Sequence, residues 1–200
     1  MNFAALILAG GKSSRMRCDK AWVEIDGQSL LARQIGLVKT SGAKEIFISG
    51  PVDSDYAKLG CPVLADKFPD AGPLAGIERG LTATTASVLL VLAVDMPKIS
   101  GALLNKLVSR CIENRGVIPA VDGRIEPLAA CYPRIASRFA TEMLLEGTRA
   151  PGRSAGPTDF ARRCIESGLA ELANLPAAVA GQFASLNTPE DLQAHQQSVL

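Results

Sequence analysis

The chain has 200 residues, 48% of them hydrophobic, which is sufficient for one core of ordinary size. An intrinsically disordered chain and a disulfide-stapled mini-protein are therefore excluded. Its 21 basic residues nearly balance its 20 acidic ones, so the formal net charge is +1. Any anionic ligand must therefore be bound by a local basic cluster rather than by the overall charge, and we expect no nucleic-acid or membrane partner.

The sequence has five widely spaced cysteines: Cys18, Cys61, Cys111, Cys131 and Cys164. Their odd number and the lack of a CxxC pair are typical of a reduced, cytoplasmic protein rather than of a disulfide framework or a redox motif. The two longest apolar runs, 3–9 and 88–94, have seven residues each. A membrane-spanning helix needs ~18 or more, so we expect none. The first basic residues follow the first apolar run, which is the wrong order for a signal peptide.

Four apolar segments in the first half of the chain lack polar–apolar alternation, as do strands buried on both faces of a parallel sheet: residues 3–9, 46–49, 63–65 and 88–94. Helical spacing of apolar residues predicts helices between and after them, over residues 30–38 (ending before Gly42), 74–84 and 103–114. This alternation of strands and helices predicts an α/β fold, a three-layer sandwich with a mostly parallel sheet.

The second half of the chain has a different pattern. Residues 117–121, a turn at Asp122-Gly123 and residues 125–132 favour an antiparallel strand pair. A helix is predicted over 135–146, and residues 147–156, with one proline and three glycines, are the best loop candidate. Thr188-Pro189-Glu190-Asp191 supplies a helix cap, a first-turn proline and an acid, so a last helix is predicted over 192–198. Without a long linker, residues 1–200 are expected to form one domain.

A glycine-rich basic segment follows the first predicted strand: Gly10-Gly11-Lys12-Ser13-Ser14-Arg15-Met16-Arg17-Cys18-Asp19-Lys20. Two glycines at the carboxyl end of a buried strand allow a sharp turn with exposed backbone N–H groups, a geometry that binds phosphate oxygens. Lys12, Arg15 and Lys20 can pair with the charge of a nucleoside triphosphate. Neither a P-loop nor a GxGxxG motif occurs at this turn. The alternative is a solvated turn whose charges only maintain solubility.

The stretch LAGGKSSRMRCDKA, residues 8–21, resembles the LAGGxSxRMGxDKA signature of molybdenum cofactor guanylyltransferases. These are the MobA-type branch of the nucleotidyltransferases, with a Rossmann-like, GT-A-like fold. The resemblance implies that Arg15 and Lys20 act on the phosphates and that the residues around the triphosphate are Leu8, Ala9, Gly10, Gly11, Lys12 and Ser13. Arg17 stands where the family usually has glycine, so this arginine is either strained or an additional phosphate ligand.

A second loop, residues 66–77, is rich in glycine and proline and leads into a predicted helix, which allows close backbone approach to a flat base. Its GPLAGI string resembles the segment that borders the purine in the same family. The implied nucleotide-binding residues are Ser49, Asp66, Gly72, Leu74, Ala75 and Gly76. Related cytidylyltransferases usually differ in this segment and often have PK in place of the DK of Asp19-Lys20, so the resemblance favours guanine. Alternatively, Gly72-Pro73 is only a turn and a helix start.

Asp95 ends the apolar run 88–94 and is followed by Met96-Pro97. A carboxylate at the carboxyl tip of a buried parallel strand places a hard oxygen ligand beside the glycine loop, and Mg²⁺ is its expected partner. Capping of the next helix is the alternative, although Ser100 is better placed for that. The resemblance agrees, because a strand-end aspartate in a DxP context is the metal ligand of these transferases.

Two later segments carry the acceptor side of the resemblance. Residues 122–128 form one, and FASLNTPEDL, residues 183–192, matches an FxNxNTPEDL pattern with Ser185 in place of the first asparagine. Arg124 and Asn187 are the residues implied to line the molybdopterin side, although a hairpin turn and a loop beside a helix cap would account for them equally well. His195, the only histidine, is interpreted as a surface residue.

The resemblance implies transfer of GMP from GTP to the phosphate of molybdopterin with release of pyrophosphate, Mg²⁺ being the cofactor. Residues up to about 100 would bind the nucleotide, and residues 101–200 the acceptor. Cofactor-biosynthesis proteins or molybdoenzyme chaperones are further possible partners. Two alternatives stay open: a nucleotidyltransferase that uses CTP or another acceptor, and a nucleotide-binding regulator that has lost turnover.

Overall fold

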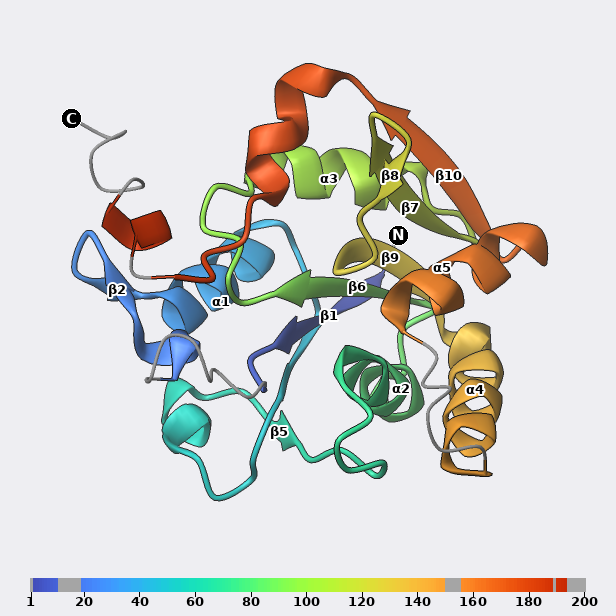
Figure 1. The fold of residues 1–200 in the computed structure, drawn as a ribbon, viewed down its shortest axis with the longest axis horizontal. Coiled ribbons are helices and arrows are strands. Elements are labelled where there is room, and N and C mark those ends of the chain that lie inside the picture. Colours follow the sequence, from blue (N-terminus) through green and yellow to red (C-terminus); the bar gives the residue numbers. More distant parts are fainter. Residues whose placement is uncertain (1, 11–18, 150–155, 189, 194–200) are drawn as a thin grey trace.

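The computed structural model describes residues 2–10, 19–149, 156–188 and 190–193 (Figure 1). Its main sheet has the strand order β10-β7-β9-β6-β1-β4-β5, and β8 pairs with β7. The strands are β1 Phe3–Leu8, β4 Glu45–Ser49, β5 Val63–Leu64, β6 Val88–Ala93, β7 Gly116–Val121, β8 Arg124–Ile125, β9 Ala129–Pro133 and β10 Ala170–Leu175. Strand β1 is parallel to β4 and β6, whereas β9 is antiparallel to β6 and β7. The mostly parallel sheet predicted from the sequence is confirmed.

Within the described ranges, five α-helices cover the sheet: α1 Leu30–Thr40, α2 Pro73–Ala83, α3 Gly101–Arg110, α4 Ser137–Arg149 and α5 Pro157–Glu166. Short 3₁₀ helices are η1 Lys20–Trp22, η2 Asp55–Leu59, η3 Arg134–Ala136 and η4 Ala177–Phe183, and β2 Glu24–Ile25 with β3 Gln28–Ser29 forms a small hairpin. Among the described residues, no helix is both long and apolar enough to cross a membrane.

The sheet separates two hydrophobic cores. Alternate residues of β1 enter opposite cores because successive side chains of a strand point to opposite faces. One core contains apolar residues of α1 and α3, and the other contains those of α2, α4 and α5. Figure 1 shows the helices on the two sides of the sheet in this grouping. The predicted three-layer α/β sandwich is therefore confirmed, and every residue of β1 and β6 is buried.

The predicted turn at Asp122-Gly123 is confirmed, because both residues have positive φ and join β7 to the antiparallel strand β8. The prediction of one strand over 125–132 is wrong. The chain leaves the sheet after Ile125 and re-enters at Ala129 as β9. Pro127, which has no N–H to donate to a ladder, lies in this interruption.

Two helix ends differ from the prediction by three residues or more. The helix predicted over 103–114 ends at Arg110, and Asn114, at φ 60°, forms a tight turn with a bridge between Ile112 and Arg115. Residues 147–149, predicted as loop, continue α4. A single glycine, Gly147, lowers the stability of a helix only slightly and does not end it. Residues 150–155 of that predicted loop lie outside the described residues.

Candidate functional site

The carboxyl ends of the parallel strands meet at one edge of the sheet. Leu8 at the end of β1 is in register with Ser49 at the end of β4 and with Ala93 at the end of β6. The residues that follow these strands, including Gly10 and Asp95, are therefore brought to the same edge. This is the edge at which ligands bind in open α/β sheets.

Three residues predicted from separate motifs meet at this edge. The Lys20 ammonium donates to Asp95 Oδ2 at 2.8 Å and to Asn187 Oδ1, also at 2.8 Å. The Lys20 and Asp95 side chains are each 18% exposed, so the ion pair is partly shielded but open to solvent. The contact spans 167 residues of sequence between Lys20 and Asn187. Two hard oxygen atoms thus converge on one cation, beside the segment predicted to bind phosphate.

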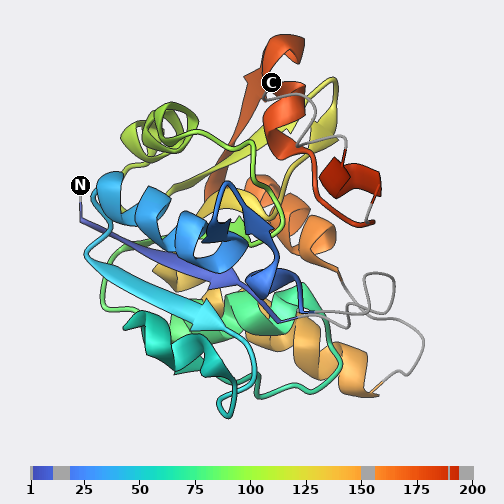
Figure 2. The same cartoon turned by 90° about the vertical axis from the view of Figure 1, so that its left-hand side faces the viewer.

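The C-terminal segment is fastened to this edge by backbone contacts. Leu186 N donates to the Asp95 carbonyl at 2.8 Å, and the last described helix, in red, lies on the same side of the molecule as the β2–β3 hairpin, the side that faces the viewer in Figure 2. Asp191 Oδ2 accepts from the backbone N–H groups of Asn187 (2.8 Å) and Thr188 (2.9 Å), and Asp191 N donates to Thr188 Oγ1. These two N–H groups lower the pKa of Asp191.

This reciprocal capping confirms the predicted helix cap at Thr188, although the helical residues begin before the predicted span of 192–198. Residues 190–193 are helical, and the rest of the predicted span, 194–198, lies outside the described residues together with His195. The cap also holds Asn187 in the position from which its side-chain oxygen reaches Lys20.

The start of the glycine segment differs from the phosphate nest that the sequence predicts. The N–H groups of Ala9 and Gly10 both donate to the Ser49 carbonyl, at 3.0 and 2.8 Å, so Gly10 has no free N–H for a phosphate. A Cβ on residue 10 would lie 3.3 Å from the Gly50 Cα. The close approach of two backbones therefore favours glycine here, which is a different reason from the one predicted.

Five other residues of this motif, which carry the remaining phosphate predictions and the departure from the family pattern, lie outside the described residues: Gly11, Lys12, Ser13, Arg15 and Arg17. The roles predicted for them remain predictions. Lys20 is the member of the motif's basic group that the structure places.

A second group of predicted residues surrounds the start of α2. The Ser49 hydroxyl donates to Asp66 Oδ1 at 3.5 Å, and Gly72, at φ 71°, caps the helix. A Cβ on Gly76 would lie 2.3 Å from Ser49 Oγ, so α2 approaches β4 more closely than alanine would permit. Burial raises the pKa of Asp66, while the Ser49 hydrogen bond and the Arg79 charge oppose this shift.

Four residues predicted to bind the nucleotide have side chains in the core: Leu8, Ala9, Leu74 and Ala75. Leu74 and Ala75 are fully buried, and the other two are nearly so. Only their backbone atoms can therefore contact a ligand. The apolar side chains of these motifs serve packing, which a motif match does not distinguish from ligand contact.

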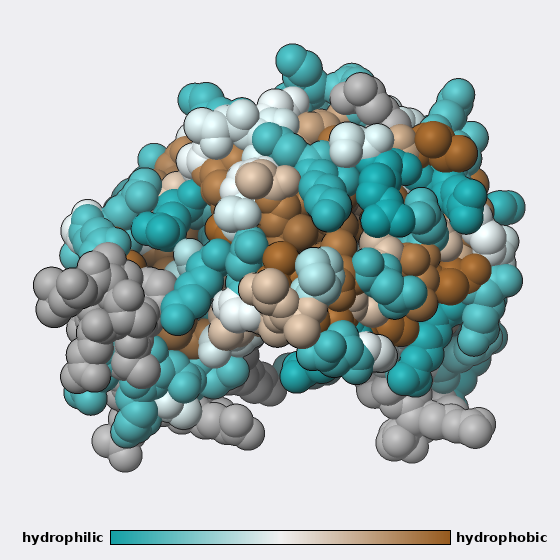
Figure 3. All heavy atoms as spheres, turned by 90° about the horizontal axis from the view of Figure 1, so that it is seen from above, coloured by the Kyte–Doolittle hydropathy of each residue, from teal (hydrophilic) through white to brown (hydrophobic). Residues whose placement is uncertain are grey.

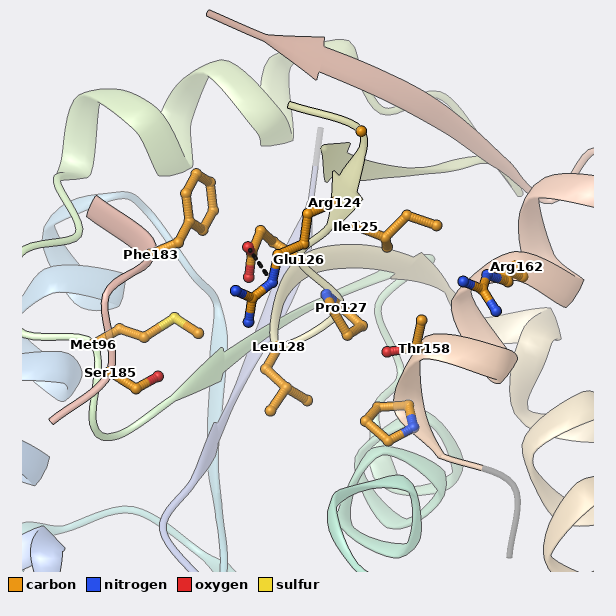
Figure 4. Close-up of a pocket in the computed structure, with 12 residues that line it drawn as sticks. Met96, Arg124, Ile125, Glu126, Pro127, Leu128, Thr158, Arg162, Phe183 and Ser185 are labelled. Carbon is orange, nitrogen blue, oxygen red and sulfur yellow. Dashed lines mark ion pairs between the residues drawn. The ribbon is translucent and has the colours of Figure 1, made fainter. Parts of the chain in front are cut away.

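Two adjoining cavities, of about 500 and 690 Å³, lie among the residues predicted to bind the acceptor. Arg124, Glu126, Phe183 and Ser185 line both cavities, and Asn187 lines the larger one. In Figure 4 the Arg124 and Glu126 side chains lie side by side as an ion pair in the first cavity, and Phe183, Met96 and Leu128 supply apolar walls. Figure 3 shows the molecule from above, with apolar residues exposed in the middle of this face and hydrophilic residues around them.

Arg124 and Glu126 differ in exposure although they form an ion pair of 3.4 Å. The Arg124 side chain is 84% exposed, whereas the Glu126 side chain is 13% exposed. Burial raises the pKa of Glu126, and the Arg124 charge lowers it. Sequence reasoning missed Glu126, because a glutamate before a proline in a turn region carries no pattern of its own.

Sequence reasoning also missed Tyr56 in η2. Its hydroxyl donates to Asp19 Oδ2 at 2.6 Å, next to Lys20 in the chain. No motif contains Tyr56, and only the fold brings it to the glycine segment.

The described residues contain no group of three or more His, Cys, Asp or Glu side chains that could hold a metal ion. A divalent ion at this edge would therefore take most of its ligands from a substrate or water. Asp95 Oδ2 and Asn187 Oδ1, which already surround a cation, are hard donors of the kind that Mg²⁺ prefers.

Comparison with known proteins identifies the family of this chain. The model of the MobA-like NTP transferase domain family matches residues 5–156. A probable molybdenum cofactor guanylyltransferase of Opitutus terrae is 32% identical over 94% of this chain and 92% of that protein. A molybdenum cofactor guanylyltransferase of Xanthomonas euvesicatoria is 33% identical over 94% and 91%.

Among solved structures, molybdopterin-guanine dinucleotide biosynthesis protein A from Archaeoglobus fulgidus has the same fold, with a TM-score of 0.71, 22% identity and 98% of both chains covered. The family match spans more than half of the chain and the curated relatives nearly all of it. The chain therefore belongs to the MobA-like nucleotidyltransferases, in the group of the molybdenum cofactor guanylyltransferases.

Proposed function

We propose that this protein transfers GMP from GTP to the terminal phosphate of molybdopterin, forming molybdopterin guanine dinucleotide and pyrophosphate. The observation that carries the proposal is the contact of Lys20 with Asp95 and Asn187 at the carboxyl edge of the sheet, in a chain whose curated relatives bear the guanylyltransferase name. Three motifs far apart in sequence supply one polar cluster there, which is expected of a reaction centre and not of a solvated turn.

In the proposed reaction, an oxygen of the acceptor phosphate forms a bond to the α-phosphorus of GTP. The bond from that phosphorus to the bridging oxygen of the β-phosphate breaks, and its electron pair leaves with pyrophosphate. Such a transfer needs positioned groups and neutralised charge rather than a covalent intermediate. Lys20 supplies a positive charge to the phosphates, and Arg15 is proposed to add another.

Asp95 is proposed to hold Mg²⁺, with Asn187 Oδ1 as a neighbouring oxygen donor. The fit rests on the two oxygen atoms that already converge on the Lys20 ammonium. When bound, the ion would supply charge neutralisation at the phosphates of GTP. Lys20 would then leave Asp95 and contact the triphosphate, because an ammonium and a metal ion on the same carboxylate oxygen would repel each other.

The acceptor is proposed to occupy the cavities lined by Arg124 and Glu126. Arg124 is largely exposed and has a long side chain, so its guanidinium can move to an incoming phosphate. Phe183 supplies a flat apolar wall for a ring system, and Asn187 links the larger cavity to the Lys20 cluster. The nucleotide would contact residues up to about 100, including Asp66 and Gly72, and the acceptor would contact the later ones.

The test is pyrophosphate release by the purified protein with Mg²⁺, molybdopterin and one nucleotide at a time. The proposal requires release with GTP, dependence on molybdopterin, and little release with CTP or ATP. Preferential use of CTP would establish the cytidylyltransferase alternative, which the names of the curated relatives do not favour. GTP binding without release would establish a regulator.

A further inference from the structure

Tyr56 packs against the ends of two central strands. It lies in η2, between β4 and β5, and is 2% exposed. Its ring rests on the backbone of Gly50, where a Cβ would come within 2.6 Å of Tyr56 Cε2. Trp22 covers it from another side, with ring centroids 5.9 Å apart. The ring is therefore fixed between the end of β4 and the segment after Lys20.

The Tyr56 hydroxyl lies between Ala9 and Asp19, which belong to the two described ends of the glycine-rich motif. It donates to Asp19 Oδ2 at 2.6 Å and lies 3.5 Å from the Ala9 carbonyl oxygen. A hydroxyl has one proton, so the shorter contact, to a carboxylate, takes it. Burial, and then Asp19, raise the pKa of Tyr56, so the hydroxyl keeps its proton at neutral pH.

Asp19 transmits this contact to Lys20. Its other oxygen, Oδ1, accepts from Ala21 N at 3.0 Å and caps η1, whose first residue is Lys20. Both oxygens of one carboxylate are therefore engaged, one by Tyr56 and one by the turn that carries Lys20. The direction in which Lys20 leaves this turn sets whether its ammonium reaches Asp95.

We propose that Tyr56 is a positioning residue for the nucleotide site: through Asp19 it holds Lys20 at the end of β1, within reach of Asp95, Asn187 and the triphosphate. The contact of Lys20 with a triphosphate rests on the proposed function, whereas the link from Tyr56 through Asp19 to Lys20 rests on the geometry. The Tyr56 hydroxyl lies within 3.5 Å of both Ala9 O and Asp19 Oδ2, and its ring packs on Gly50, so this one side chain fixes the turn that carries Lys20 relative to the ends of β1 and β4.

Two substitutions test the contact from its two ends. Tyr56→Phe removes the hydroxyl and keeps the ring. Asp19→Asn supplies an amide whose oxygen can still cap Ala21 but whose nitrogen can only donate to Tyr56, so the charge-assisted bond from the Tyr56 hydroxyl is lost. Tyr132→Phe is the matched control, because Tyr132 is fully buried and donates to Pro127 O at 2.8 Å, away from Asp19.

The first readout is the ¹H–¹⁵N signal of the Lys20 ammonium, assigned by its loss in Lys20→Met. We expect a distinct signal in the wild type, because two oxygens hold the ammonium, and its loss or broadening in Tyr56→Phe and Asp19→Asn but not in Tyr132→Phe. An unchanged Lys20 signal in folded Tyr56→Phe and Asp19→Asn would overturn the inference. This readout does not depend on any activity.

The second readout is the affinity for Mg·GTP by calorimetry. Loss of one hydrogen bond to a charged group predicts binding weaker by about tenfold in Tyr56→Phe and in Asp19→Asn. In a Lys20→Met background the same substitutions should change affinity by less than about twofold, since the residue through which they act is gone. Equal losses in both backgrounds would show a general structural role and contradict the inference. Wild-type protein that does not bind GTP would contradict the proposed function alone, because the ammonium signal still tests Tyr56.

Discussion

Replacing Asp95 with asparagine should separate nucleotide binding from catalysis. The substitution keeps the size of the side chain and removes the charge that pairs with Lys20 at 2.8 Å and is proposed to hold Mg²⁺. The asparagine oxygen can still accept from Lys20, and the pair is partly exposed, so we expect the free energy of unfolding to change by no more than about 1 kcal/mol.

The effect on turnover should be much larger. Neutralisation of charge on the phosphates by a bound metal contributes several kcal/mol, and a loss of about 2.7 kcal/mol already corresponds to a hundredfold reduction in kcat. We therefore expect kcat to fall by about a hundredfold or more. GTP affinity without metal should be kept or improved, because the substitution removes a negative charge beside the triphosphate and releases Lys20 to bind it.

The assay is pyrophosphate release across a magnesium titration, with GTP affinity measured by calorimetry and folding checked by circular dichroism. Asp55→Asn is the matched control, since Asp55 pairs with Lys58 over the same 2.8 Å but on the exposed surface. It should keep normal turnover. A folded Asp95→Asn protein with near wild-type kcat at every magnesium concentration would refute the assignment of the metal to Asp95.

Three further perturbations test other parts of the site. Arg124→Ala should raise KM for molybdopterin by about tenfold and leave KM for GTP unchanged, as expected for a lost charge-assisted contact to the acceptor; an effect on GTP alone in steady-state kinetics would contradict the acceptor assignment. Gly76→Ala should cost about 1–3 kcal/mol in urea unfolding, because its methyl would lie 2.3 Å from Ser49 Oγ. Gly36→Ala, in the open middle of α1, should instead be neutral or stabilising, and equal effects would refute the packing argument. The pKa of Asp191 is lowered in the folded protein, so its stabilising contribution is complete above the ordinary aspartate pKa of about 3.9 and is lost as pH falls through the lowered folded value. The Tm difference between wild type and Asp191→Asn should therefore shrink as pH falls below about 4, and a difference independent of pH would contradict this linkage.

The layers of the fold could be predicted because they follow from the pattern of apolar residues within single segments of the sequence. Residues 3–9 and 88–94 are apolar throughout, and a segment of that kind is stable only between two layers of helices. Edge strand β10 was not predicted, because its burial alternates and its sequence mixes alanine, glutamate and asparagine. Helix α5 was not predicted for a related reason. It buries only Phe160, Ala161 and Cys164, and charged residues stand between and beside them in the sequence.

The site could be predicted where a residue stands at the end of a strand or cap. Asp95 was predicted in this way, whereas Lys20 and Asn187 were predicted from their resemblance to family motifs, and the structure brings the three side chains together. The contacts that fix these residues could not be predicted, because they come from segments with no pattern of their own. Tyr56 reaches Asp19 only after β4 pairs with β1, and Glu126 shares a cavity with Phe183 of η4 only once the chain has folded.

The reasons for individual motif residues were also invisible in the sequence. Gly10 and Gly76 match the family pattern, yet at both positions a Cβ would crowd residues at the end of β4. Leu74 and Ala75 match it while lying in the core. A motif records which residues are needed at a site, whereas only the packed structure separates those that contact a ligand from those that shape the backbone around it.

The central claim, that the Lys20–Asp95–Asn187 cluster directs transfer of GMP to molybdopterin, is tested most directly by identifying the product. Purified protein would be incubated with Mg²⁺, molybdopterin and GTP labelled at the α-phosphate, and the products separated and weighed by mass spectrometry. We expect one molybdopterin guanine dinucleotide carrying the labelled phosphate for each pyrophosphate released, and none with Asp95→Asn in the same time. Label that appears as free GMP, or a dinucleotide formed equally well by the Asp95 variant, would contradict the claim.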